Sequence, residues 1–217
     1  MPRPAATDSA ETRRKLLGAA SEAFSRQGPE ATSLRDVARA AGLTIASVHF
    51  HFGSKDGLHR ACLEEARRGL GSEFAPFREV LESIQQKARG AARSRAEIPA
   101  LIDASVRAAL HALRQQRKAL RLLMHGLIDG GELEPAWLHG TLAPFLADTA
   151  AVLSEPLAIP ERDLRLRIQS LVALVVRHAL SSPGELRAVA GARASANVSA
   201  IYEDHLIWLA RRILLEK

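Results

Sequence analysis

The sequence predicts an all-α protein, and three observations support this prediction. Ala, Leu, Arg and Glu dominate the composition, whereas aromatic residues make up only 4%, and such a mixture favours helix over strand. Apolar residues recur three and four positions apart along most of the chain. No segment of the sequence keeps the strict alternation of apolar and polar residues that is typical of a half-buried strand. We therefore expect helices joined by short turns.

The first helix is expected to follow a loose N-terminal arm over residues 1–8, which is rich in Pro and Ala. It begins near Asp8–Glu11, where carboxylates stabilise the positive end of the helix dipole. Its apolar stripe reaches Arg26, and Gln27-Gly28-Pro29 then stops the helix. The stripe consists of Leu16, Leu17, Ala20 and Phe24.

Two short helices are expected next. The first starts at Ser33, which forms with Asp36 the S-x-x-D pattern of a capping box. It ends at Gly42, because a glycine accepts the positive φ found at many helix ends. Thr44 caps the other helix, which reaches Phe52.

A longer helix, capped by Ser54, is expected to continue through Leu70. The remaining chain keeps a helical pattern, interrupted by Pro and Gly. The predicted segments are 73–89, 97–115, 117–129, 136–155, 161–181 and 196–215, and the interruptions are Gly130-Gly131, Pro156, Pro160 and Ser182-Pro183-Gly184.

Ala38, Gly42 and Val48 have the spacing of a helix-turn-helix motif. A small residue at Ala38 lets the second helix cross closely, Gly42 makes the tight turn, and Val48 fills the corner between the helices. The pattern alone recurs by chance, but here it lies between two caps and inside helices of suitable length. The predicted core of the motif comprises Leu34, Val37, Ala38, Gly42, Val48 and Phe52.

This motif and the residues around it resemble the N-terminal domain of the TetR family of regulators. The stretches that carry the resemblance are Thr32–Ala38, Ala41–Thr44, Val48–Phe52 and Ser54–Asp56. The resemblance covers residues 12–65. The rest of the chain resembles the family only in its helical architecture, its length and its closing amphipathic helix. The resemblance implies a helix-turn-helix domain over residues 1–55 and a larger helical effector-binding and dimerisation domain over residues 56–217.

The resemblance also implies that the helix from Thr44 to His51 is a recognition helix in the major groove of double-stranded DNA. Three positions depart from common family residues: Ala46 and His49 stand where Gly and Tyr are frequent, and Gly53 replaces a frequent Pro. The side chains expected to face the bases or the adjoining backbone are Thr44, Ile45, Ala46, Ser47 and His49.

A second set of residues is expected to hold phosphates. Lys55 is a cation beside a helix N-terminus, whose free N–H groups also attract phosphate. Thr44 and Arg35 each keep a simpler alternative, as a helix cap and as a solvated surface charge. The expected phosphate contacts are Thr32, Ser33, Arg35, His51 and Lys55.

The charge of the chain is consistent with double-stranded DNA as a partner. The formal net charge is +6, which favours a polyanion without establishing one.

The cysteine content and the apolar runs bear on where the protein acts. The single cysteine, Cys62, cannot form a disulfide within the chain. The N-terminus lacks the apolar core of a secretory signal. The run Leu171–Val176 is far shorter than the roughly 20 apolar residues of a membrane span. We expect a cytoplasmic protein that binds no membrane.

The histidines do not predict a metal or catalytic site. His49 and His51 point about 200° apart on a helix and cannot easily share one metal. His59 and Cys62 could do so, but two ligands are too few for structural zinc. The sequence contains no Gly-rich phosphate loop, nucleophile elbow or H-E-x-x-H motif. We expect no cofactor, no metal and no enzymatic activity, with a small helical enzyme as an alternative that a bound metal or cofactor would reveal.

The segments 161–181 and 196–215 are apolar on more than one face and must be buried on more than one side. The resemblance implies that they pair with a second copy in a homodimer, although interior helices of a monomer would show the same pattern. The expected interface residues are Leu164, Ile168, Leu171, Val175, Ile201 and Leu209.

The resemblance further implies a repressor that binds a palindromic operator and is released by a small-molecule effector of unknown identity. The effector would bind among the helices of residues 73–155. Arg121, His125 and Asp129 share a polar stripe there, which either lines such a site or is simply solvated. A constitutive DNA-binding protein without an effector is the alternative.

Overall fold

The computed structural model describes residues 6–73, 97–128, 135–193 and 195–216. Within these ranges the regular structure is helical and contains no strand, as the sequence predicts. The chain divides into two compact units, and each is described by itself. The first unit joins Met1–Leu70 to Lys118–Glu134, and the second joins Gly71–Arg117 to Pro135–Lys217. This packing keeps the helix after Ser54 with the N-terminal helices, beyond the expected domain end at residue 55.

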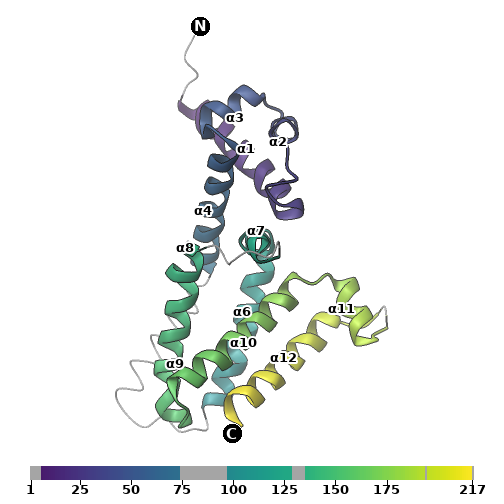
Figure 1. The fold of residues 1–217 in the computed structure, drawn as a ribbon. Coiled ribbons are helices and arrows are strands. Elements are labelled where there is room, and N and C mark those ends of the chain that lie inside the picture. Colours follow the sequence, from purple (N-terminus) through teal and green to yellow (C-terminus); the bar gives the residue numbers. More distant parts are fainter. Residues whose placement is uncertain (1–5, 74–96, 129–134, 194, 217) are drawn as a thin grey trace. The chain divides into compact units, whose positions relative to one another are not determined.

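The first unit contains α1 (Ala6–Gln27), α2 (Leu34–Ala40), α3 (Ile45–Phe52), most of α4 (Lys55–Glu73) and α7 (Arg117–Ile128) apart from its first residue. Helices α1, α2 and α3 pack on one another (Figure 1). Their fully buried side chains include Phe24 of α1, Val37 of α2 and Val48 of α3. Burial of each such side chain stabilises the unit by about 1.5–3 kcal/mol.

A tight turn separates α2 from α3. Gly42 has φ +67°, in the left-handed region that glycine adopts without strain. Its N–H donates to the carbonyl of Arg39, and the Leu43 N–H donates to the carbonyl of Ala38. This pair of bonds is the Schellman motif that ends many helices. Residues 34–52 are therefore a helix, a turn and a second helix, as the spacing of the motif predicts.

The caps of these helices agree with the sequence except in one detail. The Thr44 hydroxyl accepts from the Ser47 N–H at 3.3 Å, and the Ser54 hydroxyl accepts from the Gly57 N–H at 3.0 Å. The capping box expected at Ser33 and Asp36 is not formed. Ser33 instead accepts from the Arg35 N–H at 3.2 Å, and the Asp36 carboxylate pairs with Arg39 at 2.8 Å. Aspartate is one methylene shorter than the glutamate of a capping box, so this local partner is within easier reach.

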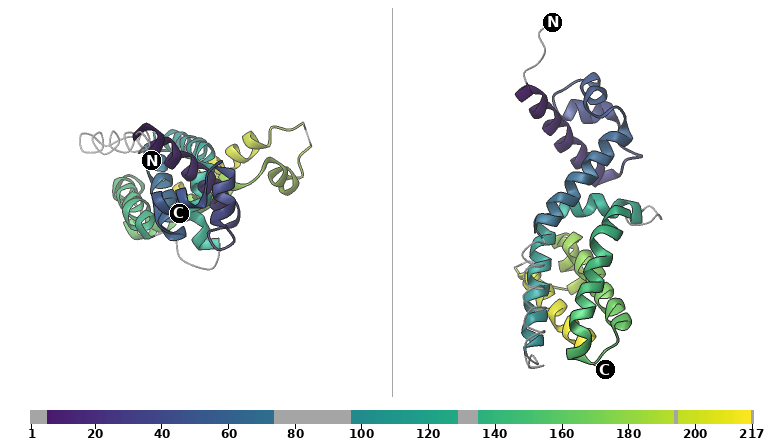
Figure 2. Two further views of the ribbon diagram at one scale, coloured as in Figure 1. Left: turned by 90° about the horizontal axis from the view of Figure 1, so that it is seen from above. Right: turned by 90° about the vertical axis from the view of Figure 1, so that its left-hand side faces the viewer.

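The second unit contains α6 (Ile98–Gln115), α8 (Pro135–Trp137), a π-helical segment (Leu138–Leu142), α9 (Ala143–Leu157), α10 (Glu161–Leu180), α11 (Pro183–Ala190) and α12 (Val198–Leu215). Helix α10 packs against α6, α9 and α12, and α6 also packs along α12 (Figures 1 and 2). Asp103 pairs with Arg211 and Arg107 with Glu203, so α6 and α12 run antiparallel.

Two predicted segments of this unit need correction. The helix expected over 136–155 begins at Pro135, contains the π-helical turn and ends at Leu157. The stretch Ser182-Pro183-Gly184, expected only to interrupt the helical pattern, starts the additional helix α11. Ser182 accepts from the Glu185 N–H at 3.1 Å, and a proline is favourable in the first helical position because its missing N–H needs no partner there. The segment expected over 73–89 lies almost entirely outside the described residues.

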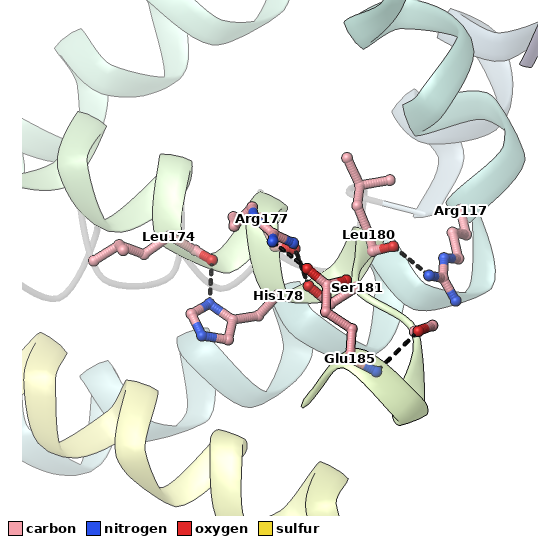
Figure 3. Close-up of polar contacts among 8 residues, drawn as sticks. Arg117, Leu174, Arg177, His178, Leu180, Ser181 and Glu185 are labelled. Atoms are coloured by element: carbon pink, nitrogen blue, oxygen red, sulfur yellow. Dashed lines mark hydrogen bonds and ion pairs between the residues drawn. The ribbon is translucent and has the colours of Figure 1, made fainter. Parts of the chain in front are cut away.

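Two arginines lie at the C-terminal end of α10 in this unit (Figure 3). Arg177 bonds to the Ser181 hydroxyl and pairs with Glu185 of α11. Arg117 donates to the Leu180 carbonyl at the C-terminal end of α10. Both cations lie where the helix dipole is negative, so they stabilise this end.

Among the described helices, no single one is long and apolar enough to span a membrane. One pair, Leu138–Leu157 with Glu161–Leu180, reaches the required length and hydropathy only when the two are taken together across a 118° bend.

Candidate nucleic-acid interface

Helix α3 turns one face to solvent. Successive helical residues point about 100° apart, so the side opposite the fully buried Val48 is the side that is free. The residues exposed on α3 are Ile45, Ala46, His49 and Phe50. Three of these, Ile45, Ala46 and His49, were expected from the sequence to face DNA.

Phe50 is the exposed residue that the sequence interpretation missed. Its side chain is 79% exposed, the highest value among the exposed large apolar side chains of the described residues. The ring meets that of His51 edge-on, with centroids 5.1 Å apart. Phe50 lies two residues after Val48 and therefore about 200° around the helix from it. This spacing from a core residue could have predicted that Phe50 is exposed.

His49 carries a defined hydrogen-bonding pattern. Its Nδ1 lies 2.9 Å from the Gly53 carbonyl oxygen, which only accepts, so Nδ1 donates the proton. In the neutral ring Nε2 is then an acceptor. A neutral His49 can therefore accept from the exocyclic amino group of a base.

The hydroxyls at the start of α3 bond to each other. The Thr44 and Ser47 hydroxyl oxygens are 3.0 Å apart, and the Thr44 oxygen also accepts from the Ser47 backbone. Thr44 is exposed and Ser47 half-buried. Thr44 thus caps α3, the simpler role considered for it, and its outer surface stays open to a ligand.

Lys55 lies where a phosphate contact is expected, beside the turn between α1 and α2. Its ammonium group donates to the Glu30 carbonyl at 3.3 Å. Ser33, the N-cap of α2, and Arg35 on α2 are exposed. His51 is half-buried between the rings of Phe50 and Phe52.

Thr32 has a structural position instead. Its side chain is only 3% exposed. The hydroxyl donates to the Gly28 carbonyl at 2.7 Å, and the N–H donates to the Pro29 carbonyl at 3.2 Å. Because both groups are used within the α1–α2 turn, the phosphate contact expected for Thr32 does not fit its burial.

The interior of this unit holds two further titratable groups. His59 packs edge-on against Phe24 with centroids 5.1 Å apart. Burial raises the pKa of the Cys62 thiol to about 11, so the thiol is neutral and unreactive at ordinary pH. Within the described part of the chain, no three His, Cys, Asp or Glu side chains converge on a metal-sized site.

Polar residues of α7 interact with α1 of the same unit. Lys118 pairs with Glu22 of α1 at 2.8 Å. The hydrogen bond and the charge of Lys118 lower the pKa of the Glu22 carboxyl, and the positive charge of Arg121 adds a smaller lowering. Arg121 therefore also interacts electrostatically with Glu22 of α1. His125 is half-buried, and Asp129 lies outside the described residues.

Four of the expected dimer contacts belong to the core of one chain. Leu164, Ile168, Leu171 and Val175 are all buried, because this face of α10 packs on the neighbouring helices of its own unit. Ile201 is exposed and Leu209 half-buried. The exposed apolar side chains on the outer surfaces of α10 and α12 are Leu166, Ile201 and Trp208.

The fold and the α3 surface define an all-α helix-turn-helix protein. Residues 16–62 match the family model described as bacterial regulatory proteins of the tetR family. The chain therefore carries a tetR-family N-terminal domain over these residues, as the resemblance of the motif implies.

Proteins named as transcriptional regulators are similar to part of the chain, and a solved structure shares its fold. The chain is similar to the HTH-type transcriptional regulator SrpR of Pseudomonas putida, with 28% identity over 60% of this chain and 54% of that protein. It is similar to the HTH-type transcriptional repressor KstR2 of Rhodococcus jostii, with 35% identity over 44% of this chain and 42% of that protein. The alignments therefore span about half of these relatives' lengths or less. A TetR-like transcriptional regulator from Rhodococcus sp. RHA1 shares the fold over 100% of both chains, with TM-score 0.63 and 22% identity.

Proposed function

We propose that the chain is a DNA-binding transcriptional regulator of the bacterial cytoplasm. The exposed face of α3 carries this proposal. This face presents Ala46, His49 and Phe50 to water, and an α-helix is narrow enough to enter a major groove. Family membership points to a regulator rather than an enzyme.

The side chains of this face suit a site rich in thymine and in exposed amino groups. Ile45, Ala46 and Phe50 offer apolar contacts to thymine methyl groups, and His49 offers an acceptor. In this proposal Lys55, Ser33 and Arg35 hold the flanking phosphates. Because short apolar side chains discriminate weakly one at a time, the shape of the DNA contributes to specificity.

The regulator acts as a homodimer on a palindromic site. A two-fold dimer presents two copies of α3 to major grooves about 34 Å apart. The buried face of α10 is not available for this contact, so the interface uses the outer surfaces, which include Leu166 on α10 and Trp208 on α12. This assignment replaces the buried residues expected from the sequence.

Repression with release by a small molecule is the proposed mode of action. It is supported by the family and by the description of KstR2, a relative of this chain, as a repressor. The dimer would have two arrangements, and in one of them the spacing of the two α3 helices matches that of successive major grooves. An effector shifts the balance between them only if it binds the two arrangements with different affinity.

Selection of bound sequences from random duplex DNA tests the proposal. The expected result is an enriched motif with two-fold symmetry. Ala46→Glu, which places a carboxylate on the exposed face of α3, is expected to abolish the enrichment without unfolding the unit, because the site is exposed. Ala108→Glu makes the same change at an exposed position of α6 and should leave the motif unaltered. The proposal that α3 reads DNA would be contradicted if the wild-type chain enriches no motif. It would also be contradicted if Ala46→Glu enriches the same motif as strongly as the wild-type chain.

A further inference from the structure

Arg13 on α1 reaches the end of helix α3. Its side chain is exposed, and its guanidinium carbon lies 5.2 Å from the centroid of the Phe52 ring. Phe52 is the last residue of α3, so the cation sits at one end of the helix that faces DNA in the proposed function. Helices α1 and α3 pack against each other (Figure 1).

The charge of Arg13 differs from that of the paired cations around it. Lys15 pairs with Glu11 at 2.9 Å, also on α1. Arg39 and Lys118 pair with Asp36 and Glu22, each at 2.8 Å. No carboxylate of the described residues pairs with Arg13. An uncompensated cation keeps its full field for a polyanionic partner, whereas a paired one does not.

The contact with Phe52 also restrains the Arg13 side chain. It is a cation–π contact at 5.2 Å from the ring centroid, and no described residue accepts a hydrogen bond from the guanidinium. The N–H groups of the guanidinium therefore remain available to donate to two oxygens of one phosphate. The ring thus limits the positions of a long side chain before any ligand arrives, which reduces the entropy lost on binding.

We propose that Arg13 is a DNA-backbone contact, in which its guanidinium, held over Phe52, binds a phosphate beside the bases read by α3. This inference rests on the proposed function and extends the interface to the first helix. Nothing in the spacing of the helix-turn-helix motif points to Arg13, because the residue lies outside that motif.

The salt dependence of binding to a random-sequence duplex tests this assignment. Each phosphate contact contributes about 0.9 to the slope of log affinity against log salt concentration, measured between about 50 and 200 mM. Arg13→Gln is expected to reduce the slope by about one unit. Arg13→Lys keeps the charge and should preserve the slope while lowering affinity, because lysine lacks the two-pronged geometry.

Lys15→Gln is the matched control, since it removes one positive charge from α1 about 200° around the helix from Arg13. It is expected to leave the slope unchanged. If Arg13 has only a structural role, Arg13→Gln will lower the melting temperature and leave the slope unchanged. That outcome would overturn the assignment of Arg13 and leave the proposed function standing. A wild-type chain that binds no duplex at any salt concentration would overturn the proposed function together with it.

Discussion

His59 lies in the interior of the first unit, one turn after Lys55 on α4. Its Nε2 is buried and has no hydrogen-bond partner among the described residues. Burial disfavours the charged ring and lowers the pKa from its ordinary value of 6.5; Asp56 opposes this effect, and His125 and Lys55 add to it. The folded unit therefore prefers the neutral imidazole.

This preference makes stability depend on pH in a defined direction. The folded pKa lies below the unfolded one, so below pH 6.5 the unfolded chain binds more protons. The free energy of unfolding is expected to fall as the pH drops from 6.5 through the folded pKa, and to be independent of this group above 6.5. Urea unfolding followed by circular dichroism over this range measures the change.

His59→Gln is expected to flatten that pH dependence, because glutamine does not titrate. His111→Gln provides the control, since His111 is exposed on α6 and its removal should leave the wild-type slope. An equal slope in wild type and His59→Gln would show that another group controls the acid response.

Individual residues show where sequence alone falls short. The exposed face of α3 follows from helical geometry once Val48 is placed in the core, and Ala46 and His49, which the family resemblance implied as DNA contacts, both lie on it. Phe50 was missed because an aromatic side chain is normally assigned to a core. Thr32 was misplaced because a threonine before a helix has the same sequence pattern whether its hydroxyl faces a ligand or the Gly28 carbonyl. Only the three-dimensional path of the turn separates these cases.

Among the helices, α9 ends with an unfavourable residue. Ala158 caps the helix at φ 55° and ψ 42°, a left-handed conformation that suits glycine and costs alanine roughly 1 kcal/mol. Its N–H donates to the Glu155 carbonyl, and the Ile159 N–H donates to the Ser154 carbonyl. The backbone pattern therefore fixes this conformation whatever the side chain.

Ala158→Gly is expected to stabilise the protein by about 0.5–1 kcal/mol, because the strain disappears and the exposed methyl group buries little surface. The melting temperature should rise by about 1–4 °C. Ala151→Gly, at an exposed position inside the same helix, should instead destabilise by about 0.5–1 kcal/mol. A lower melting temperature for both variants would argue against strain at Ala158.

Helix positions were predictable wherever an apolar stripe persists for several turns, as in α6, α10 and α12. The exception was α11, whose eight residues are too few to show a period and begin with Pro183. It forms because of contacts made in the folded unit. Arg177 pairs with Glu185, and Leu186 lies in one buried cluster with Val198 and Tyr202. Such tertiary contacts stabilise short helices that local propensity does not specify.

At the scale of the whole molecule, α12 carries a stripe that none of the described helices covers. Ile201, His205, Trp208 and Arg212 follow one another at intervals of four, three and four residues, so they share one face. The Trp208 ring stacks on His205 with centroids 5.7 Å apart, and Arg212 lies over it at 5.2 Å. Trp208 is nevertheless 51% exposed. A half-exposed tryptophan flanked by an arginine is typical of the residues that dominate protein interfaces.

Trp208→Glu is therefore expected to weaken the proposed dimer by about 2 kcal/mol or more, roughly 30-fold, because it removes a large apolar contact and buries a carboxylate. Light scattering after size exclusion should shift toward the 23.5 kDa of one chain. Leu166→Glu tests the outer face of α10 in the same way. Val189→Glu is the control, since Val189 is 75% exposed on α11 and outside both faces. If the wild-type chain is dimeric and neither variant dissociates it while helicity is retained, the two copies must meet through another surface.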